Sequence, residues 1–180
     1  MTVVTSPSTP TQGGGGDGSN KLIFSEICDH DSLDNVYFVE LYNAGNSAIS
    51  LQGWKVLRYT NGSTLAAEYI LPNESLASGA VWLVAYAAGD TEFESAFGAA
   101  SDYDNVINAN GDDVYALVYD DNSNVKDIYG EIGVDGTDTE WEYKDSNAQR
   151  STSVNSSSAV WNASEWNITA GSGTVSPGSH

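Results

Sequence analysis

Residues 36–54 limit what this chain can fold into more than any other stretch. They read VYFVELYN, AGNSAISL and QGW: an apolar run with one charge, Glu40, then an Asn/Gly turn and a second run. A buried carboxylate without a partner is costly, so Glu40 needs a partner if its strand is buried. We predict that Glu40 is structural, either accepting hydrogen bonds or pairing with a cation such as Arg150 or Lys55, and that Asn43 makes the turn. A polar contact with a ligand is the alternative for Glu40 and Asn43.

The remaining sequence continues the two-residue period that is typical of β-strands. Asn61-Gly62 predicts a tight hairpin. A helix is expected at 91–98, where Thr91 and Glu94 have the spacing of a capping box. Many short strands with at most one short helix predict an all-β protein, an antiparallel sandwich or barrel. We expect strands near 21–28, 36–43, 47–51, 54–60, 66–71, 80–86, 113–119 and 125–130, with weaker ones near 141–144 and 148–153.

The charge of the chain bears on its partners. It carries 25 Asp and Glu against 6 Lys and Arg, a formal net charge of −19. Such a surface repels nucleic acids and anionic membranes and attracts cations. We therefore expect no nucleic-acid binding by this chain alone. We also expect no membrane insertion, because its apolar runs are well short of roughly 18 residues.

Both ends have the composition of linkers. Residues 1–20 combine Ser, Thr and Pro with four consecutive glycines, and residues 170–180 are rich in Gly and Ser. Such compositions form flexible connections. We predict a flexible linker at 1–20, one folded domain at 21–169 and a flexible tail at 170–180. Linkers at both ends are typical of a module within a longer chain, so we expect neighbouring domains, with any targeting signal outside this sequence.

A series of short motifs occurs in a recognisable order across most of the chain. The series is LIFSEI (22–27), FVELYN (38–43), ISLQGW (49–54), ILP (70–72), LASG (76–79), NGD (110–112), VYALV (114–118), DIYG (127–130) and IG (132–133), then Trp141, Arg150 and Trp166.

This series resembles the lamin tail domain, an immunoglobulin-like antiparallel β-sandwich, over roughly residues 21–168. The resemblance implies a module without enzymatic activity, found in nuclear lamins and in secreted and surface proteins of bacteria. The chromatin role of lamins is not carried over, because a charge of −19 makes this chain a poor DNA binder. We take as structural motif residues Glu40, Asn43, Gly53, Trp54, Asn110, Gly111, Asp112, Gly130, Trp141, Arg150 and Trp166.

The loop DHDSLDN (29–35) is the best candidate for a metal site. Asp29, Asp31 and Asp34 supply carboxylates, and Ca²⁺ takes 6–8 oxygen ligands. The spacing does not match an EF-hand, and a solvated loop is the alternative. We expect no required cofactor, with Ca²⁺ as the one candidate.

Catalytic motifs are missing from the sequence. Cys28 is the single cysteine, and His30 is the one base near it, so we predict a small apolar role for Cys28. Among the tryptophans, Trp54 and Trp82 are expected in the core. Trp161 and Trp166 are expected either to be exposed, where they could form a carbohydrate-stacking platform, or to clamp the C-terminal tail.

We therefore predict a non-catalytic accessory module that serves adhesion or anchoring in a larger secreted or cell-surface bacterial protein, with protein or glycan ligands. Two alternatives stay open. A cleft with convergent carboxylates would favour an acidic, cation-dependent hydrolase. An exposed strand edge would favour a self-associating structural module.

Overall fold

The structure, a computed structural model, describes residues 20–121, 123–171 and 174–180. Most of its regular elements are strands, as the sequence predicts, with one α-helix in the described part. The elements are β1 (Leu22–Asp29), β2 (Tyr37–Asn43), β3 (Ile49–Ser50), β4 (Trp54–Tyr59), β5 (Ala66–Ile70), β6 (Ser75–Leu76), β7 (Val81–Tyr86), α1 (Asp90–Phe97), β8 (Asp102–Asp104), β9 (Val114–Tyr119), β10 (Val125–Tyr129), β11 (Ser146–Arg150) and β12 (Trp166–Ala170), with 3₁₀ turns at Ala87–Gly89 and Ala163–Glu165.

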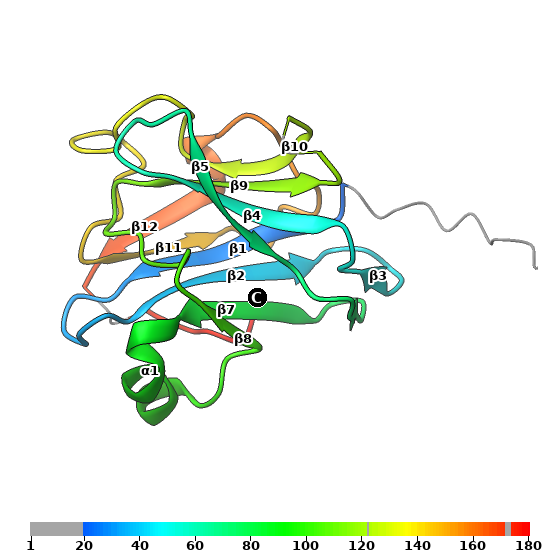
Figure 1. Ribbon diagram of the computed structural model, residues 1–180, viewed down its shortest axis with the longest axis horizontal. Coiled ribbons are helices and arrows are strands. Elements are labelled where there is room, and N and C mark those ends of the chain that lie inside the picture. The colour runs from blue at the N-terminus through cyan, green and yellow to red at the C-terminus, as the bar shows by residue number, and fades with distance from the viewer. Residues whose placement is uncertain (1–19, 122, 172–173) are drawn as a thin grey trace, which may run out of the picture.

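Two sheets lie face to face (Figure 1). The larger has the order β12-β11-β1-β2-β7-β8 and the smaller the order β10-β9-β4-β5, while β3 and β6 form a separate two-stranded ribbon. Paired strands in the described part are antiparallel except β7 and β8, which run parallel. The predicted all-β sandwich is therefore confirmed.

The main core lies between the sheets. Val39 and Leu41 of β2 point into it, and Trp54 and Val56 of β4 contribute from the smaller sheet. All four side chains are fully buried. Strand alternation puts Glu40 on the opposite, outer face of the larger sheet, which explains how a charge fits inside an apolar run.

A second apolar cluster covers part of that outer face. Phe93 of α1 packs there with Cys28, Phe38 and Leu83, and Figure 1 shows α1 beside β7 and β8. The helix prediction is confirmed, but the capping box is wrong. The helix starts after Gly89 without a side-chain cap, and Thr91 N–H donates to the neighbouring Asp90 at 2.6 Å.

No helix in the described residues is long and apolar enough to cross a membrane.

Three elements escaped sequence reasoning, and one expected strand is missing. β6 and β8 have two and three residues, too few to show a period. β12 (WNITA) is an edge strand that pairs only with β11. Residues 141–144, expected as a weak strand, are irregular with turns at 141 and 144, and their alternating Trp141 and Tyr143 are buried without a strand partner. The alternation of apolar residues at 141–144 therefore reflects burial in an aromatic cluster and not pairing in a sheet.

Residues 174–180, which we call the strap, lie on the outer face of the larger sheet. Val175 packs against the second apolar cluster, and the His180 ring lies 4.6 Å from that of Tyr42 on β2. Figure 1 marks the C-terminal end near β2 and β7. The strap is part of the segment predicted as a flexible tail; the linker predicted at 1–20 lies outside the described residues except for Asn20.

Candidate functional site

Tyr129, the last residue of β10, is the centre of an aromatic cluster. It is fully buried, and its hydroxyl donates to the backbone oxygen of Trp141 at 2.9 Å. Four rings meet it edge-on: Trp141 at 6.4 Å, Tyr143 at 5.3 Å, Trp161 at 6.2 Å and Trp166 at 4.8 Å between ring centroids. Edge-to-face contacts restrict ring orientations. The Tyr129 ring therefore orients the indoles of Trp161 and Trp166, which are partly exposed.

Beside this cluster is a partly open hollow of about 700 Å³, which we call the indole pocket. Its apolar walls come from β10, the loop after it and the segment before β12. Those walls are Ile128, Ile132, Val134, Trp141, Ala159, Val160 and Trp161, and Glu131, Thr139 and Glu140 also line it. A concave, mostly apolar hollow with a few polar groups is the usual form of a ligand site.

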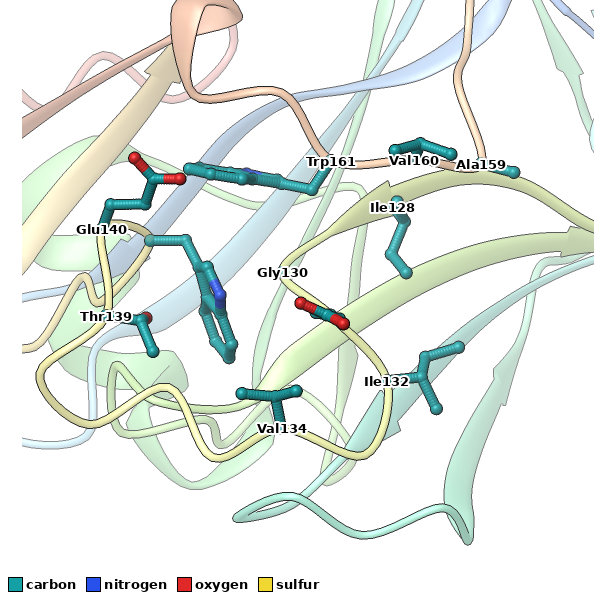
Figure 2. Close-up of a pocket in the computed structure, with 11 residues that line it drawn as sticks. Ile128, Gly130, Ile132, Val134, Thr139, Glu140, Ala159, Val160 and Trp161 are labelled. Carbon is teal, nitrogen blue, oxygen red and sulfur yellow. The ribbon is translucent and has the colours of Figure 1, made fainter.

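The side chains of the pocket face one another across it. Figure 2 shows Trp161 and Val160 on one side, with Val134 and Ile132 opposite and the Glu140 carboxylate beside the Trp161 ring. The Thr139 hydroxyl already donates to Gly136 O at 2.7 Å. Glu131 and Glu140 are exposed. The pocket therefore offers apolar walls and two carboxylates that can accept hydrogen bonds, while the donor of the Thr139 hydroxyl is already used.

Two glycines let the pocket loop lie this close to the sandwich. A Cβ at Gly136 would stand 2.3 Å from the Trp141 ring, and one at Gly111 would stand 2.2 Å from Lys144 Cα. Gly111 also has φ +97°, a conformation that other residues adopt only with strain. The Gly111–Lys144 contact joins two separate loops, so no local motif indicates it, whereas Gly136 and Trp141 lie in the same loop after β10.

The structure also brings together two carboxylates that the sequence analysis did not pair. Glu26 on β1 stands directly opposite Glu40 on β2, and they are 2% and 0% exposed. Burial raises the pKa of Glu26 to about 7; a hydrogen bond from the Ser176 N–H lowers it, and the charge of Glu40 raises it further. Burial likewise raises the pKa of Glu40.

The strap covers this carboxylate pair. Ser176 N–H donates to Glu26 Oε1 at 3.0 Å, and Gly178 N–H donates to Glu40 Oε2 at 2.6 Å. The Gln149 side chain holds the strap through Thr174 O at 2.8 Å. A hollow of about 250 Å³ beside the strap is lined by Glu26 but not by Glu40, so a substrate would have to displace the strap to reach both carboxylates.

Of the two structural roles predicted for Glu40, the structure shows hydrogen-bond acceptance and not a cation pair. Glu40 is buried, but it accepts a hydrogen bond from the Ser25 hydroxyl at 2.7 Å rather than from a cation. Arg150 lies on the inner side of β11 and donates to Asp127 Oδ2 at 2.6 Å, and Lys55 pairs with Glu68 at 2.8 Å. The two predicted cations are held by other carboxylates.

Arg150 connects the two sheets. Besides Asp127 of β10 it contacts Glu165 at 2.6 Å and Phe24 O at 3.3 Å, and its guanidinium lies 5.3 Å from the centre of the Trp166 ring. Asp127 also accepts the backbone N–H of Phe24 at 2.8 Å. Arg150 and Trp166, both named as motif residues, thus belong to one buried network.

The other motif residues lie in turns and in the core. The Asn43 amide donates to three backbone oxygens, of Ser47, Leu76 and Ala77, at 2.9–3.1 Å. Gly53 precedes the buried Trp54, and Gly130 follows Tyr129; each has φ +88°. Asn110 is exposed, and Asp112 accepts the Gly136 N–H through its backbone oxygen at 3.0 Å.

Asp113, the first residue of the strand expected at 113–119, is fully buried and pairs with Arg58 at 2.9 Å. Nothing in the NGDD sequence itself distinguishes Asp113 from Asp112.

The predicted metal loop has a different arrangement. Asp29 accepts the Asp145 N–H at 3.1 Å, and burial raises its pKa to about 6. His30 Nδ1 accepts the N–H groups of Ser32 and Leu33. Across the described residues, no three His, Cys, Asp or Glu side chains gather as a metal-ligating group, so Asp29, Asp31 and Asp34 do not converge. Ca²⁺ binding itself stays a prediction.

The remaining predictions concern Cys28 and the tryptophans. Cys28 is buried, and burial raises the pKa of its thiol, the reverse of what a nucleophile needs. Trp54 is in the core as expected, whereas Trp82 is partly buried. Trp161 and Trp166 are partly buried and pack on Tyr129 rather than on the strap.

The family of this chain is shown by comparison with models of known protein families. The model of the Lamin Tail Domain family matches residues 17–133. The chain belongs to the lamin tail domain family. Its sandwich is thus the immunoglobulin-like β-sandwich that the motif series implied. The match covers the strands up to β10 and the first part of the pocket loop, while Trp141 and Trp161 lie beyond it. No match to a curated protein was found.

Proposed function

We propose that this lamin tail domain is a non-catalytic binding module that uses the indole pocket to hold a partner. The observation that carries the proposal is the pocket itself, a hollow of about 700 Å³ walled by two indoles and five aliphatic side chains. The lamin tail domain fold is compatible with such a role. The module would serve adhesion or anchoring in a larger secreted or surface protein of a bacterium, alongside neighbouring domains.

The acidic surface supports the same proposal. A net charge of −19 makes binding of nucleic acid or of an anionic membrane by this chain unfavourable. Ca²⁺ is kept as a candidate ligand of the 29–35 loop, although the described side chains there do not converge. Calorimetric titration tests this, and no heat at millimolar Ca²⁺ would exclude it.

The hydrolase alternative would have its centre at Glu26 and Glu40. Their adjacency and the raised pKa of Glu26 are what an acid–base pair requires. Both side chains are nevertheless almost completely buried, and the backbone N–H groups of the strap occupy both carboxylates. We therefore prefer the binding module, in which this pair fastens the strap.

The self-association alternative would use β5, an edge strand of the smaller sheet. Ile70 of β5 and Leu65 just before it are 62% and 84% exposed, and such an exposed apolar edge favours pairing. The net charge opposes the approach of a second copy, so we again prefer the binding module.

The test is a binding panel read by surface plasmon resonance. Basic, neutral and acidic synthetic peptides and neutral oligosaccharides are immobilised, and the protein is compared with its Trp161→Ala variant. Trp82→Ala is the matched control, because Trp82 is also partly buried but does not line the pocket. The proposal expects at least one probe whose binding is lost with Trp161→Ala and kept with Trp82→Ala. If no probe behaves so, the proposed function is wrong.

A further inference from the structure

We propose that the indole pocket binds a lysine or arginine side chain of a basic protein segment. This inference rests on the proposed function, because it names the ligand class of the same site. Apolar walls, an acidic rim and lysines and arginines that lie elsewhere in the protein support this ligand class.

The walls suit an alkyl stem better than a sugar. Sugars are recognised through several hydrogen bonds, both donated and accepted, in addition to stacking. Glu131 and Glu140 offer acceptors in the pocket, but the Thr139 hydroxyl already donates to Gly136 O at 2.7 Å. Ile128, Ile132, Val134 and Val160 present hydrocarbon instead. The methylene stems of lysine and arginine bury well against such surfaces while their charged heads stay near water. A hollow of about 700 Å³ has room for more than one side chain, which favours a peptide segment over a single residue.

The rim supplies the opposite charge. Glu131 and Glu140 line the pocket and are exposed. The surrounding segment 130–142 contains five acidic residues and no lysine or arginine. A cation held over an indole face is attracted by the ring as well, and Figure 2 shows the Glu140 carboxylate beside the Trp161 ring. A cationic head at this end would meet the ring and the carboxylate together.

The protein's own cations do not neutralise this rim. Arg58 and Arg150 are held in ion pairs with Asp113 and Asp127, at 2.9 and 2.6 Å. Lys55 pairs with Glu68. Of the six lysines and arginines, all of which lie in the described residues, none lines the pocket or forms an ion pair with Glu131 or Glu140. The negative charge of Glu131 and Glu140 is thus available to a positively charged group of a partner.

Val160 allows a test that does not endanger the fold, since its side chain is 74% exposed and lines the pocket. The probe is a short acetylated and amidated peptide with three lysines, titrated by calorimetry. A copy with acetylated lysines and the neutral oligosaccharides of the panel serve as comparisons. Val160→Lys should weaken binding of the lysine peptide, and Val160→Glu should strengthen it, each by roughly 1.5- to 5-fold, the range of one exposed charge pair. Glu140→Gln should weaken it similarly, and Glu92→Gln on α1 should leave it unchanged.

The outcomes separate this inference from the proposed function. If the acetylated peptide binds as well as the lysine peptide, or if Val160→Lys and Val160→Glu behave alike, the cationic ligand is wrong. A different result would be that neutral oligosaccharides bind and lose this binding with Trp161→Ala, while the lysine peptide does not bind. The proposed binding module would then stand, and its ligand would be a glycan. If no probe depends on Trp161, both the inference and the proposed function are wrong.

Discussion

Replacing Arg150 by methionine should destabilise the protein more than any comparable change at an exposed ion pair. The Arg150 side chain is 2% exposed and lies 2.6 Å from Asp127, whose side chain is 0% exposed. Removing one partner of a buried pair leaves the other charge buried alone, which typically costs about 3–5 kcal/mol. Asp127 keeps the N–H groups of Phe24 and Ser158 at 2.8 and 2.9 Å. Because these two hydrogen bonds still stabilise the Asp127 carboxylate, we expect a loss of unfolding free energy at the lower end of the range, about 3 kcal/mol.

The assay is urea unfolding at pH 7, monitored by tryptophan fluorescence. For a domain of this size, a loss of about 3 kcal/mol corresponds to a fall in melting temperature of roughly 6–12 °C. Lys55→Met is the matched control, because it removes a cation from a more exposed pair, Lys55–Glu68, with side chains 22% and 44% exposed. Its expected cost is about 0–1 kcal/mol. The double variant Asp127→Asn/Arg150→Met should regain part of the loss, because the buried charge is gone.

If Arg150→Met costs no more than Lys55→Met at an unchanged m-value, the buried pair does not hold the sheets together as argued. A double variant less stable than Arg150→Met alone would also contradict the reasoning, because it would mean that the unpaired Asp127 charge is not the source of the loss.

Two further predictions concern proton linkage and loop packing. The pKa of Glu26 in the folded protein, about 7, exceeds the usual carboxyl value of 4.5, so the folded state binds more protons than the unfolded chain between these values. The free energy of unfolding should therefore fall as the pH rises from about 4.5 to about 7, by up to about 3 kcal/mol from this group. Urea unfolding between pH 4 and 8 should show a flatter profile for Glu26→Gln, and an unchanged slope would contradict the assignment. Gly111→Ala should destabilise by more than the roughly 1–3 kcal/mol of backbone strain alone, because its Cβ would meet Lys144 Cα at 2.2 Å. Gly79→Ala, with φ +72° but open space around it, is the control, and equal melting temperatures for the two variants would refute the packing argument.

Much of the sandwich was predictable because strand periodicity is local. The alternation around Glu40 and the turn at Asn43 are written within a few residues of each other, and both features are in the structure. The elements that failed are those whose formation depends on a distant partner. β12 is a polar strand that exists through its pairing with β11, and the alternating Trp141 and Tyr143 are buried around Tyr129 rather than in a sheet.

The candidate site was less predictable for the same reason. Trp141 and Trp161 were each noted in the sequence, but as a structural residue and as an exposed platform or clamp. The pocket arises because Tyr129 orients both rings from a third segment. The carboxylate pair likewise requires the register of β1 against β2 and the return of a segment about 150 positions away, since Ser176 reaches Glu26.

The amino-acid order thus settled the strand pattern, the burial expected of Glu40, the acidic surface and the family, because each is a property of local alternation, composition or motif order. Only the tertiary structure decided that Ser25 and Gly178, not a cation, meet Glu40. It also decided that Arg150 binds Asp127, and that two tryptophans enclose a pocket. These are contacts between segments far apart in the chain, and several partners of equal chemistry compete for each. Which partner makes the contact depends on the three-dimensional arrangement of the segments, and the local sequence around each residue does not indicate it.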